Sequence, residues 1–336
     1  LEQPYWSQGF NEAASIGEAQ YFATGAICLS LYRFVFVTFF NKNIFDENKV
    51  PYLYDVVNDG NWTLEYQRQI SQNIYTDVNG DGNKDVNDQY GFITNHNMIG
   101  VDAYWSACDL PILSKDENNF LKYDVNVERL SYAVDQINLL LHENDGAYCV
   151  DNKSADAEQD DICRMFAQDQ AAMTTLRLIH VESADMRNMS SLYGIVPVPK
   201  YDENQENYRT VMGNPVTLYS ISVSTPKKDI CAAVLECMAS NGYRLTTPAI
   251  FENNMKKKYS VDDINAQMYD IVRESVSFEL GRFMNKYLSN ITDIFFAALV
   301  SNDAKWGSTA AKYSKPLAKQ MEKVVESILE NEAKLG

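Results

Sequence analysis

Two kinds of apolar segment alternate along this chain, and their alternation constrains the fold more than any other feature. Residues 34–40 and 193–200 are short and rich in valine, isoleucine and aromatic residues, which is typical of buried strands. Residues 126–143 carry apolar side chains at helical spacing, and 313–334 are expected to form a long terminal helix. Strands that alternate with helices throughout predict the α/β class.

The other expected elements follow the same pattern. Extended structure is expected at 27–41, with a break near Tyr32-Arg33, and at 90–94, 171–179, 193–200 and 216–223. Helices are expected at 63–75, 101–108, 126–143, 162–168, 230–241, 261–273, 291–299 and 313–334. Residues 115–123 are hairpin-like, and 151–161 form an acidic loop. Thr63 is the expected N-cap of its helix, and Trp62 is assigned a structural role.

The composition limits the classes of partner. A chain of 336 residues with 46% hydrophobic residues can build one large domain or two. Its 29 Lys and Arg residues against 46 Asp and Glu residues give a net charge of −17. Nucleic acids and anionic membrane surfaces are disfavoured as partners, because phosphate groups require clustered basic side chains. No apolar run reaches the ~18–20 residues needed to span a bilayer.

The six cysteines and three histidines do not predict a metal or catalytic centre. None of the cysteines forms a CxxC motif, and the histidines lack metal-ligand spacing. Cys149 and Cys163 flank the acidic loop. They could pair in an oxidising compartment, although buried free thiols are the preferred interpretation.

Residues 77–88 have the spacing of an EF-hand calcium loop. Oxygen-bearing side chains fall at loop positions 1, 3, 5, 9 and 12, with glycine at position 6. The candidate ligands are Asp77, Asn79, Asp81, Asn83 (through its backbone carbonyl), Asp85 and Asp88. Asp88 stands where a longer Glu is usual, so affinity and metal choice are open. The alternative is a polar turn without metal. A bound calcium ion would have a structural role at the entrance to strand 90–94.

Several motifs occur in an order that resembles a known family. Tyr21–Gly25 and Phe39–Phe45 resemble the "lY..tg" and "fyNKdlF" segments of extracellular solute-binding proteins of ABC importers. The motifs that follow in family order are Trp62-Thr63, Asp88–Phe92, Phe166–Met173, Tyr193–Lys200 and Pro226–Ala239. The resemblance covers nearly the whole chain and is greatest to the carbohydrate-binding, maltose-binding-protein-like branch.

This resemblance implies a periplasmic-binding-protein-like fold with two α/β lobes joined by hinge strands. Residues 1–36 and 219–268 would form the N-terminal lobe, and 37–218 and 269–336 the C-terminal lobe. Family chains usually begin earlier, so the N-terminal lobe is expected to be incomplete, as in a fragment or a chain that starts late. Hinge crossings are expected at 33–37, at 213–217 and after Glu274, with lobe closure on ligand binding.

The resemblance also implies the partners and the location. The ligand would be a carbohydrate held in the cleft, and the closed protein would dock on ABC permease membrane subunits without performing chemistry. A monomer is expected, in the form of an extracellular cell-surface lipoprotein of a Gram-positive-type bacterium. Residue 1 is Leu rather than Met, which is consistent with a trimmed chain.

Candidate ligand-binding residues combine aromatic faces with planar polar groups, as sugar recognition requires. By position in the family they are Tyr104, Trp105, Arg177, Arg33, Asn214 and Phe296. Core packing is the alternative for Trp105, and an internal salt bridge for Arg177. Hinge hydrogen bonding is the alternative for Arg33 and Asn214. Of Phe295 and Phe296, one is expected in the core.

Three other functions compete with sugar transport. The same fold could bind a peptide, an amino acid or another small solute. A glycan-acting enzyme would need paired carboxylates in a cleft, but the sequence has no nucleophile elbow, phosphate loop or catalytic metal cluster. A calcium-dependent adhesion module is suggested only by residues 77–88.

Overall fold

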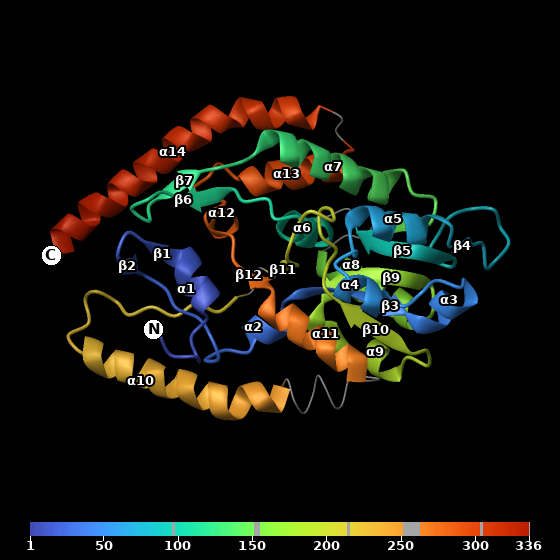
Figure 1. Ribbon diagram of the computed structural model, residues 1–336, viewed down its shortest axis with the longest axis horizontal. Coiled ribbons are helices and arrows are strands. Elements are labelled where there is room, and N and C mark those ends of the chain that lie inside the picture. The colour runs from blue at the N-terminus through green and yellow to red at the C-terminus, as the bar shows by residue number, and fades with distance from the viewer. Residues whose placement is uncertain (96–97, 151–154, 214–215, 251–262, 303–304, 336) are drawn as a thin grey trace.

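The computed structural model describes residues 1–95, 98–150, 155–213, 216–250, 263–302 and 305–335 (Figure 1). A six-stranded mixed sheet lies at the centre of the larger part, in the order β10-β3-β9-β5-β4, with β8 also paired to β5. Its strands are β3 (Phe36–Asn41), β4 (Tyr75–Thr76), β5 (Gln89–Asn95), β8 (Ala147–Val150), β9 (Ala171–Arg177) and β10 (Tyr193–Val196). The α/β class is confirmed.

The other elements surround this sheet or form the second, smaller part. The helices are α1 (Gln8–Ala14), α2 (Ser30–Arg33), α3 (Lys42–Glu47), α4 (Leu53–Asn58), α5 (Leu64–Gln72), α6 (Met98–Ala107), α7 (Val127–His142), α8 (Ala155–Ala167), α9 (Ala184–Asn188), α10 (Lys228–Asn241), α11 (Asp263–Glu274), α12 (Leu280–Phe283), α13 (Ile291–Val300) and α14 (Trp306–Leu335). The short strands are β1 (Ser15–Ile16), β2 (Ala19–Gln20), β6 (Leu113–Lys115), β7 (Leu121–Tyr123), β11 (Thr210–Val211) and β12 (Val276–Ser277).

Strand β3 supplies both cores of the larger part, because successive side chains of a strand point to opposite faces. Phe36 and Phe40 pack with residues of α6, α7, α13 and α14 on one face. Val37 and Phe39 pack with residues of α8 and α11 on the other. All six residues of β3 are buried. Each fully buried apolar side chain contributes about 1.5–3 kcal/mol, so this strand is central to stability.

Local sequence signals set the ends of the helices that flank the sheet. The Thr63 hydroxyl accepts a hydrogen bond from the Tyr66 amide at 3.2 Å, which confirms it as the N-cap of α5. Trp62 is fully buried and donates from Nε1 to the Pro197 carbonyl at 2.8 Å, so its structural role is confirmed. The Asn126 side chain caps α7 by accepting from the Arg129 amide at 3.0 Å.

Residues 1–27 pack against α10 to form the smaller part. Trp6, Ala23 and Ala239 make its buried core. The Glu236 carboxylate accepts hydrogen bonds from Tyr5 Oη at 2.5 Å and Trp6 Nε1 at 3.0 Å, which ties the first residues of the chain to α10. In Figure 1, α10 and α14 run along opposite edges of the molecule, with α1 and the β1–β2 hairpin between them.

Two sequence predictions of local structure are wrong, whereas the break expected near Tyr32-Arg33 within 27–41 is present as α2 (Ser30–Arg33). In α2 the Ser30 Oγ accepts from the Thr217 amide at 3.0 Å, a long-range contact. Residues 216–223 form no strand, and Tyr219 pairs with Ala23 only as an isolated bridge. The described end of the expected acidic loop, from Ala155 onward, is already helical in α8.

The predicted lobe boundary at residue 268 is also misplaced, because it cuts through α11. The side chain of Asn265 accepts from the Ile195 amide of β10 at 2.8 Å, and Tyr269 and Val272 pack into the core of the sheet. The whole described length of α11 therefore belongs with the larger lobe.

Cys149 and Cys163 are free thiols that lie on opposite faces of the central sheet, so the alternative of a disulfide between them is wrong. Burial raises the pKa of Cys149 to about 12 and that of Cys163 to about 11. Both thiols therefore stay protonated and unreactive at neutral pH.

A glycine-to-alanine pair tests how closely α5 approaches the sheet. A Cβ at Gly91 of β5 would overlap the backbone oxygen of Ser71 on α5, whereas a Cβ at Gly9 of α1 would meet nothing within 4 Å. We expect Gly91→Ala to lower the free energy of unfolding by about 1–3 kcal/mol. Gly9→Ala should leave it unchanged or raise it, because alanine favours helix. Urea titration measures both, and equal effects would contradict the packing described.

Candidate functional site: an interlobe cavity

Three chain segments cross side by side between the two lobes. Phe34 accepts a backbone hydrogen bond from Gly213 at 2.8 Å, and Val35 bridges to Met212. Strand β11 continues this contact by pairing in parallel with β12. The crossings at 33–37, near 213 and after Glu274 are thus adjacent, as expected for a two-lobed protein with hinge strands.

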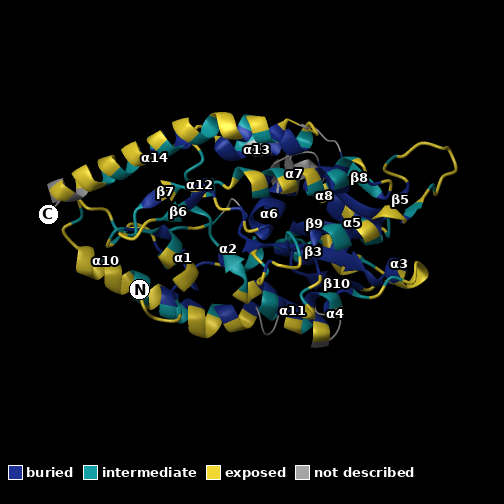
Figure 2. Cartoon of the chain, turned by 45° about the horizontal axis from the view of Figure 1, so that its top comes forward, coloured by how far each residue is buried: buried dark blue, intermediate teal, exposed yellow. Residues whose placement is uncertain are grey.

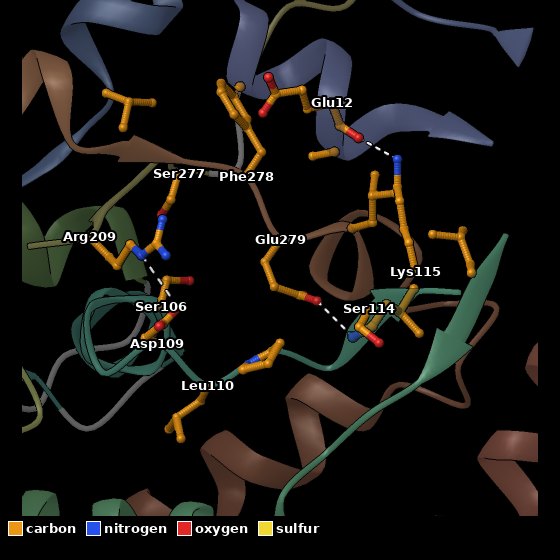
Figure 3. Close-up of a pocket in the computed structure, with 17 residues that line it drawn as sticks. Glu12, Ser106, Asp109, Leu110, Ser114, Lys115, Arg209, Ser277, Phe278 and Glu279 are labelled. Carbon is orange, nitrogen blue, oxygen red and sulfur yellow. Dashed lines mark hydrogen bonds and ion pairs between the residues drawn. The ribbon is translucent and has the colours of Figure 1, made fainter. Parts of the chain in front are cut away.

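A cavity of about 420 Å³ opens where the lobes meet (Figure 3). Its smaller-lobe wall is α1, with Glu12. The facing wall is the end of α6 and strand β6, which contribute Ser106, Asp109 and Ser114. Strand β12 and the residues after it close the remaining side. The volume lies in the range of about 300–1,000 Å³ that is typical of small-molecule sites.

Aromatic contacts hold the smaller lobe against the wall of the cavity. Phe10 of α1 is almost fully buried, and its ring meets that of Phe278 edge-on, with ring centres 5.2 Å apart. Phe283 makes a second edge contact with Phe10 at 6.4 Å. Phe278 also lines the cavity, so it provides an apolar surface beside the polar groups.

Charged side chains of both signs lie at the rim. Arg209 Nε is 3.4 Å from Asp109 Oδ1, and both side chains are about half exposed. Lys115 donates from Nζ to Ser15 Oγ at 2.9 Å and to the Glu12 carbonyl. Burial lowers the pKa of Lys115. The rim can therefore offer both hydrogen-bond donors and acceptors to a bound molecule.

A hairpin contact spans the two lobes beside the cavity. Asn119, in the β6–β7 turn, accepts from the Gly17 amide at 2.9 Å. Its side-chain amide donates to the Gly17 carbonyl at 2.6 Å and to Ser15 Oγ at 3.2 Å. Gly17 has φ +59° and lies over the Phe120 ring, a conformation that favours glycine. We call this set of bonds the hairpin latch.

Glu279 fixes the position of β6 and does not offer a free carboxylate to the cavity. Its Oε1 accepts from the Ile112 and Leu113 amides at 3.1 and 3.0 Å, and its Oε2 accepts from the Arg282 amide at 2.9 Å. Burial raises the pKa of Glu279, while these backbone donors oppose the rise. The carboxylate joins β6 to the N-terminus of α12.

A buried ion pair joins the two walls behind the cavity. Arg282 of α12 donates from Nε to Asp102 Oδ1 at 2.9 Å, pairs a second time through Nη2, and donates from Nη1 to the Met212 carbonyl at 3.1 Å. The two side chains are only 7% and 6% exposed. Burial raises the pKa of Asp102, and Arg282 opposes this. The pair links α6, α12 and a hinge segment.

Two serine side chains of the cavity lining have hydroxyls without a hydrogen-bond partner among the described residues. Ser106 Oγ and Ser114 Oγ are buried and make no hydrogen bond with any described part of the chain. Leaving a buried polar group unpaired costs about 1–3 kcal/mol. Because both oxygens are almost completely buried, a ligand with hydroxyl groups would reach them only with a local side-chain rearrangement.

Five of the six predicted ligand-binding residues lie in the described part, and none of these five lines the cavity. Tyr104 and Trp105 are 0% and 2% exposed, and Tyr104 Oη bonds to Thr175 Oγ1 at 3.0 Å, so the structure places both in core packing. Phe296 is also in the core. Asn214 lies outside the described residues, as does the side chain of Phe295.

The two predicted arginines take part in contacts within the protein. Arg33 forms a bidentate ion pair with Glu182, from Nε at 3.1 Å and Nη2 at 2.5 Å, which is the hinge-bonding alternative. The guanidinium of Arg177 lies over the Phe36 ring at 5.6 Å, and its Nε is close to where a Cβ on Gly213 would stand. Both arginines therefore support the hinge region.

The cavity residues were missed for an identifiable reason. The sequence pattern points to the aromatic residues of α6, whereas the residue of this helix that lines the cavity is Ser106, one position beyond Trp105. Asp109 has φ +52°, a backbone feature that the sequence does not reveal. Arg209 and Phe278 come from distant segments that meet only in the folded chain.

The calcium-like loop is ordered by its own side chains. Asp77 accepts from the Gly80 and Gly82 amides at 2.6 and 2.9 Å, and both glycines have positive φ. Asp88 is fully buried and accepts from the Val78 amide at 3.2 Å, which holds the two ends together. Among the described residues, no group of three or more His, Cys, Asp or Glu is placed to hold a metal ion.

No helix in the described portion of the chain combines the length and the hydrophobicity that a membrane span requires.

Comparisons with known proteins give the fold. No family model and no curated protein matches the chain. The sugar-binding protein MalE from Xanthomonas citri matches 97% of this chain and 76% of its own, with TM-score 0.63 and 12% identity. The maltose/maltodextrin-binding domain MalE from Bdellovibrio bacteriovorus, bound to maltotriose, matches 93% and 76%, with TM-score 0.56 and 16% identity. The substrate-binding protein Lmo0181 from Listeria monocytogenes, in complex with cycloalternan, matches 95% and 76%, with TM-score 0.55 and 15% identity.

The chain therefore has the fold of maltose-binding-protein-like substrate-binding proteins of ABC transporters, as the sequence motifs predicted.

Removing Arg282 tests the ion pair. In Arg282→Met the Asp102 carboxylate stays buried without its partner, so we expect the free energy of unfolding to fall by about 3–5 kcal/mol. The loss should be larger at pH 8 than at pH 4, because a buried unpaired carboxyl has a raised pKa and is protonated only at the lower pH. Urea titration at both values measures this.

Two further variants control the experiment. Asp102→Asn combined with Arg282→Met should recover part of the loss, because no charge is then buried. Arg187→Met, at an exposed position on α9, should change the stability little. A loss in Arg282→Met no larger than in Arg187→Met would show that the pair does not stabilise the fold.

Proposed function

We propose that this protein is the extracellular solute-binding component of an ABC importer and that it binds a carbohydrate in the interlobe cavity. The main support is the lining residues Ser106 and Ser114, whose buried hydroxyls make no hydrogen bond within the described part of the chain, because sugar hydroxyls both donate and accept hydrogen bonds. Phe278 adds an apolar surface for a sugar ring. The similar structures bound to maltotriose and cycloalternan support the same ligand class.

The proposal includes the delivery step. Ligand contacts to both walls would favour a closed arrangement of the lobes, and the closed form would dock on the permease subunits. The protein would act as a monomer and as a cell-surface lipoprotein of a Gram-positive-type bacterium. It would perform no chemistry on the ligand, in keeping with similar structures that are transport proteins.

A non-sugar solute is the second candidate. Arg209 and Lys115 at the rim could bind the carboxylate of an amino acid or peptide. Asp109 lies beside Arg209 and offsets its charge, which favours a neutral ligand over an anion.

Isothermal titration against maltotriose, raffinose, glutamate and a tripeptide separates these candidates. We expect heat from an oligosaccharide only. The double variant Ser106→Ala, Ser114→Ala should weaken that binding by about 10- to 30-fold, since each hydroxyl bond is worth about 1 kcal/mol. Its melting temperature should not fall, because neither hydroxyl has a partner within the described protein.

Ser190→Ala is the matched control, because Ser190 is exposed and remote from the cavity lining. It should bind like the unchanged protein. Heat from glutamate or the tripeptide alone would reject the carbohydrate proposal in favour of the second candidate.

We further propose that residues 77–88 bind calcium as a structural ion. The loop already carries the two glycine turns and the carboxylates that a hard cation prefers. A bound calcium ion would have no role beyond fixing the loop before β5. Its oxygen ligands would come from Asp77, Asn79, Asp81, Asn83, Asp85 and Asp88.

Calcium at about 100 times its dissociation constant should stabilise the fold by about 2.7 kcal/mol, seen as a higher melting temperature. Asp81→Ala should abolish the shift, because Asp81 is exposed and contributes mainly to the loop. Asp135→Ala, at an exposed position on α7, should retain it. An unchanged melting temperature with calcium would identify the loop as a polar turn.

A further inference from the structure

A second hollow lies on the surface of the larger lobe, between α5 and α7. Its volume is about 410 Å³, and it shares no lining residue with the interlobe cavity. Glu65 and Gln69, one turn apart on α5, line it together with Tyr132 and Gln136, one turn apart on α7. The two helices pack side by side (Figure 1). The turn at 201–204 completes the lining. We call this hollow the α5–α7 groove.

Aromatic rings are concentrated in the groove. Tyr66, Tyr132 and Tyr201 all line it. Tyr132 is 51% exposed, and its ring centre lies 5.3 Å from that of Tyr201. The guanidinium of Arg129 lies 4.4 Å from the centre of the Tyr201 ring and holds that ring in place. Tyr132 therefore offers an exposed apolar face beside a fixed second ring.

The polar lining is acidic, because Glu65, Asp202 and Glu203 line the groove and no lysine or arginine is among its described lining residues. Both oxygens of Glu65 accept from Arg68, at 2.9 and 2.7 Å, and this contact lowers the pKa of Glu65. Asp202 Oδ1 accepts from the amides of Asn204 and Gln205 at 3.0 Å each. With the exposed Glu203, these carboxylates disfavour an anionic ligand, and their free lone pairs can accept hydrogen bonds from the hydroxyl groups of an uncharged sugar.

Amide side chains supply the remaining polar groups. Gln136 and the exposed Asn61, Gln69 and Asn204 line the groove. An amide presents a donor and an acceptor in one plane, which matches pairs of adjacent hydroxyl groups. Tyrosine faces and amide groups together are the side chains that bind sugar rings and sugar hydroxyls.

The floor of the groove is rigid before any ligand binds. Leu64 donates to the Lys200 carbonyl at 3.0 Å, and Lys200 Nζ donates to the Gln205 carbonyl at 2.7 Å. The Tyr201 amide donates to Gln205 Oε1 at 3.0 Å. A preformed site does not have to order its side chains on binding, which favours affinity.

We propose that the α5–α7 groove is a second carbohydrate-binding site for a neutral oligosaccharide. One sugar ring stacks on Tyr132, and hydroxyl groups bond to Gln136 and Gln69. The site would hold part of a longer glycan at the surface of the lobe, separately from a sugar in the interlobe cavity. It does not depend on the interlobe proposal, because its lining is distinct.

Saturation-transfer NMR tests this site with the full chain and three probes: maltopentaose, cellopentaose and xylopentaose. We expect transfer to at least one probe in the variant Ser106→Ala, Ser114→Ala, whose interlobe cavity is impaired. In that background, Tyr132→Ala should weaken the binding by about tenfold, and Tyr132→Phe, which keeps the ring face, should retain it. Gln136→Ala is a second variant that removes one amide and leaves the ring.

Tyr287→Ala is the control, because this tyrosine is 66% exposed and lies outside the groove. Its binding should be unchanged. Transfer that survives both Tyr132→Ala and Gln136→Ala would overturn the groove proposal and leave the interlobe proposal standing. Displacement of the probe by spermine would identify the groove as a cation site instead. The absence of saturation transfer to all three probes would also reject the groove proposal.

Discussion

Arg282 reaches from α12 into the interior and meets Asp102 of α6 and the carbonyl of Met212 in the hinge. Ser106 lies one helical turn beyond Asp102, so it projects from the same side of α6. The ion pair therefore sets the position of the helix face that lines the cavity. Glu279, three residues before Arg282, fixes β6 and thereby Ser114. One short segment positions both hydroxyls, from two different elements.

This arrangement explains why the buried carboxylates of the cavity wall are not available to a ligand. The charges that could compete with a ligand are used inside the wall, where Asp102 and Glu279 already have partners. The cavity lining combines serine side chains, whose hydroxyl oxygens are buried, with an aromatic ring and a rim of balanced charge. A site of this kind favours hydroxyl-rich, uncharged molecules, because a net charge would lose its hydration without a matching partner.

The sequence was informative where one local property determines structure. Helical spacing predicted α7, the Thr63 cap predicted the start of α5, and continuous apolar character predicted β3. Ordered motifs predicted the two-lobed fold. The strand predicted at 216–223 is wrong, because its local structure is decided by long-range contacts such as the isolated bridge between Tyr219 and Ala23. The cavity was missed because five distant segments build it, and no spacing within one segment marks it.

The hairpin latch has a consequence for the motions of the protein. Asn119 and Gly17 connect the lobes beside the cavity through partly exposed hydrogen bonds, each worth about 1 kcal/mol net. Breaking the hairpin latch alone would therefore cost only a few kcal/mol, whereas the buried Phe10 contacts with Phe278 and Phe283 add to the cost of separating the lobes. The buried Asp102–Arg282 pair, by contrast, holds α6, α12 and the Met212 segment together and does not cross to the smaller lobe. Hinge motions between lobes fall on the microsecond-to-millisecond scale.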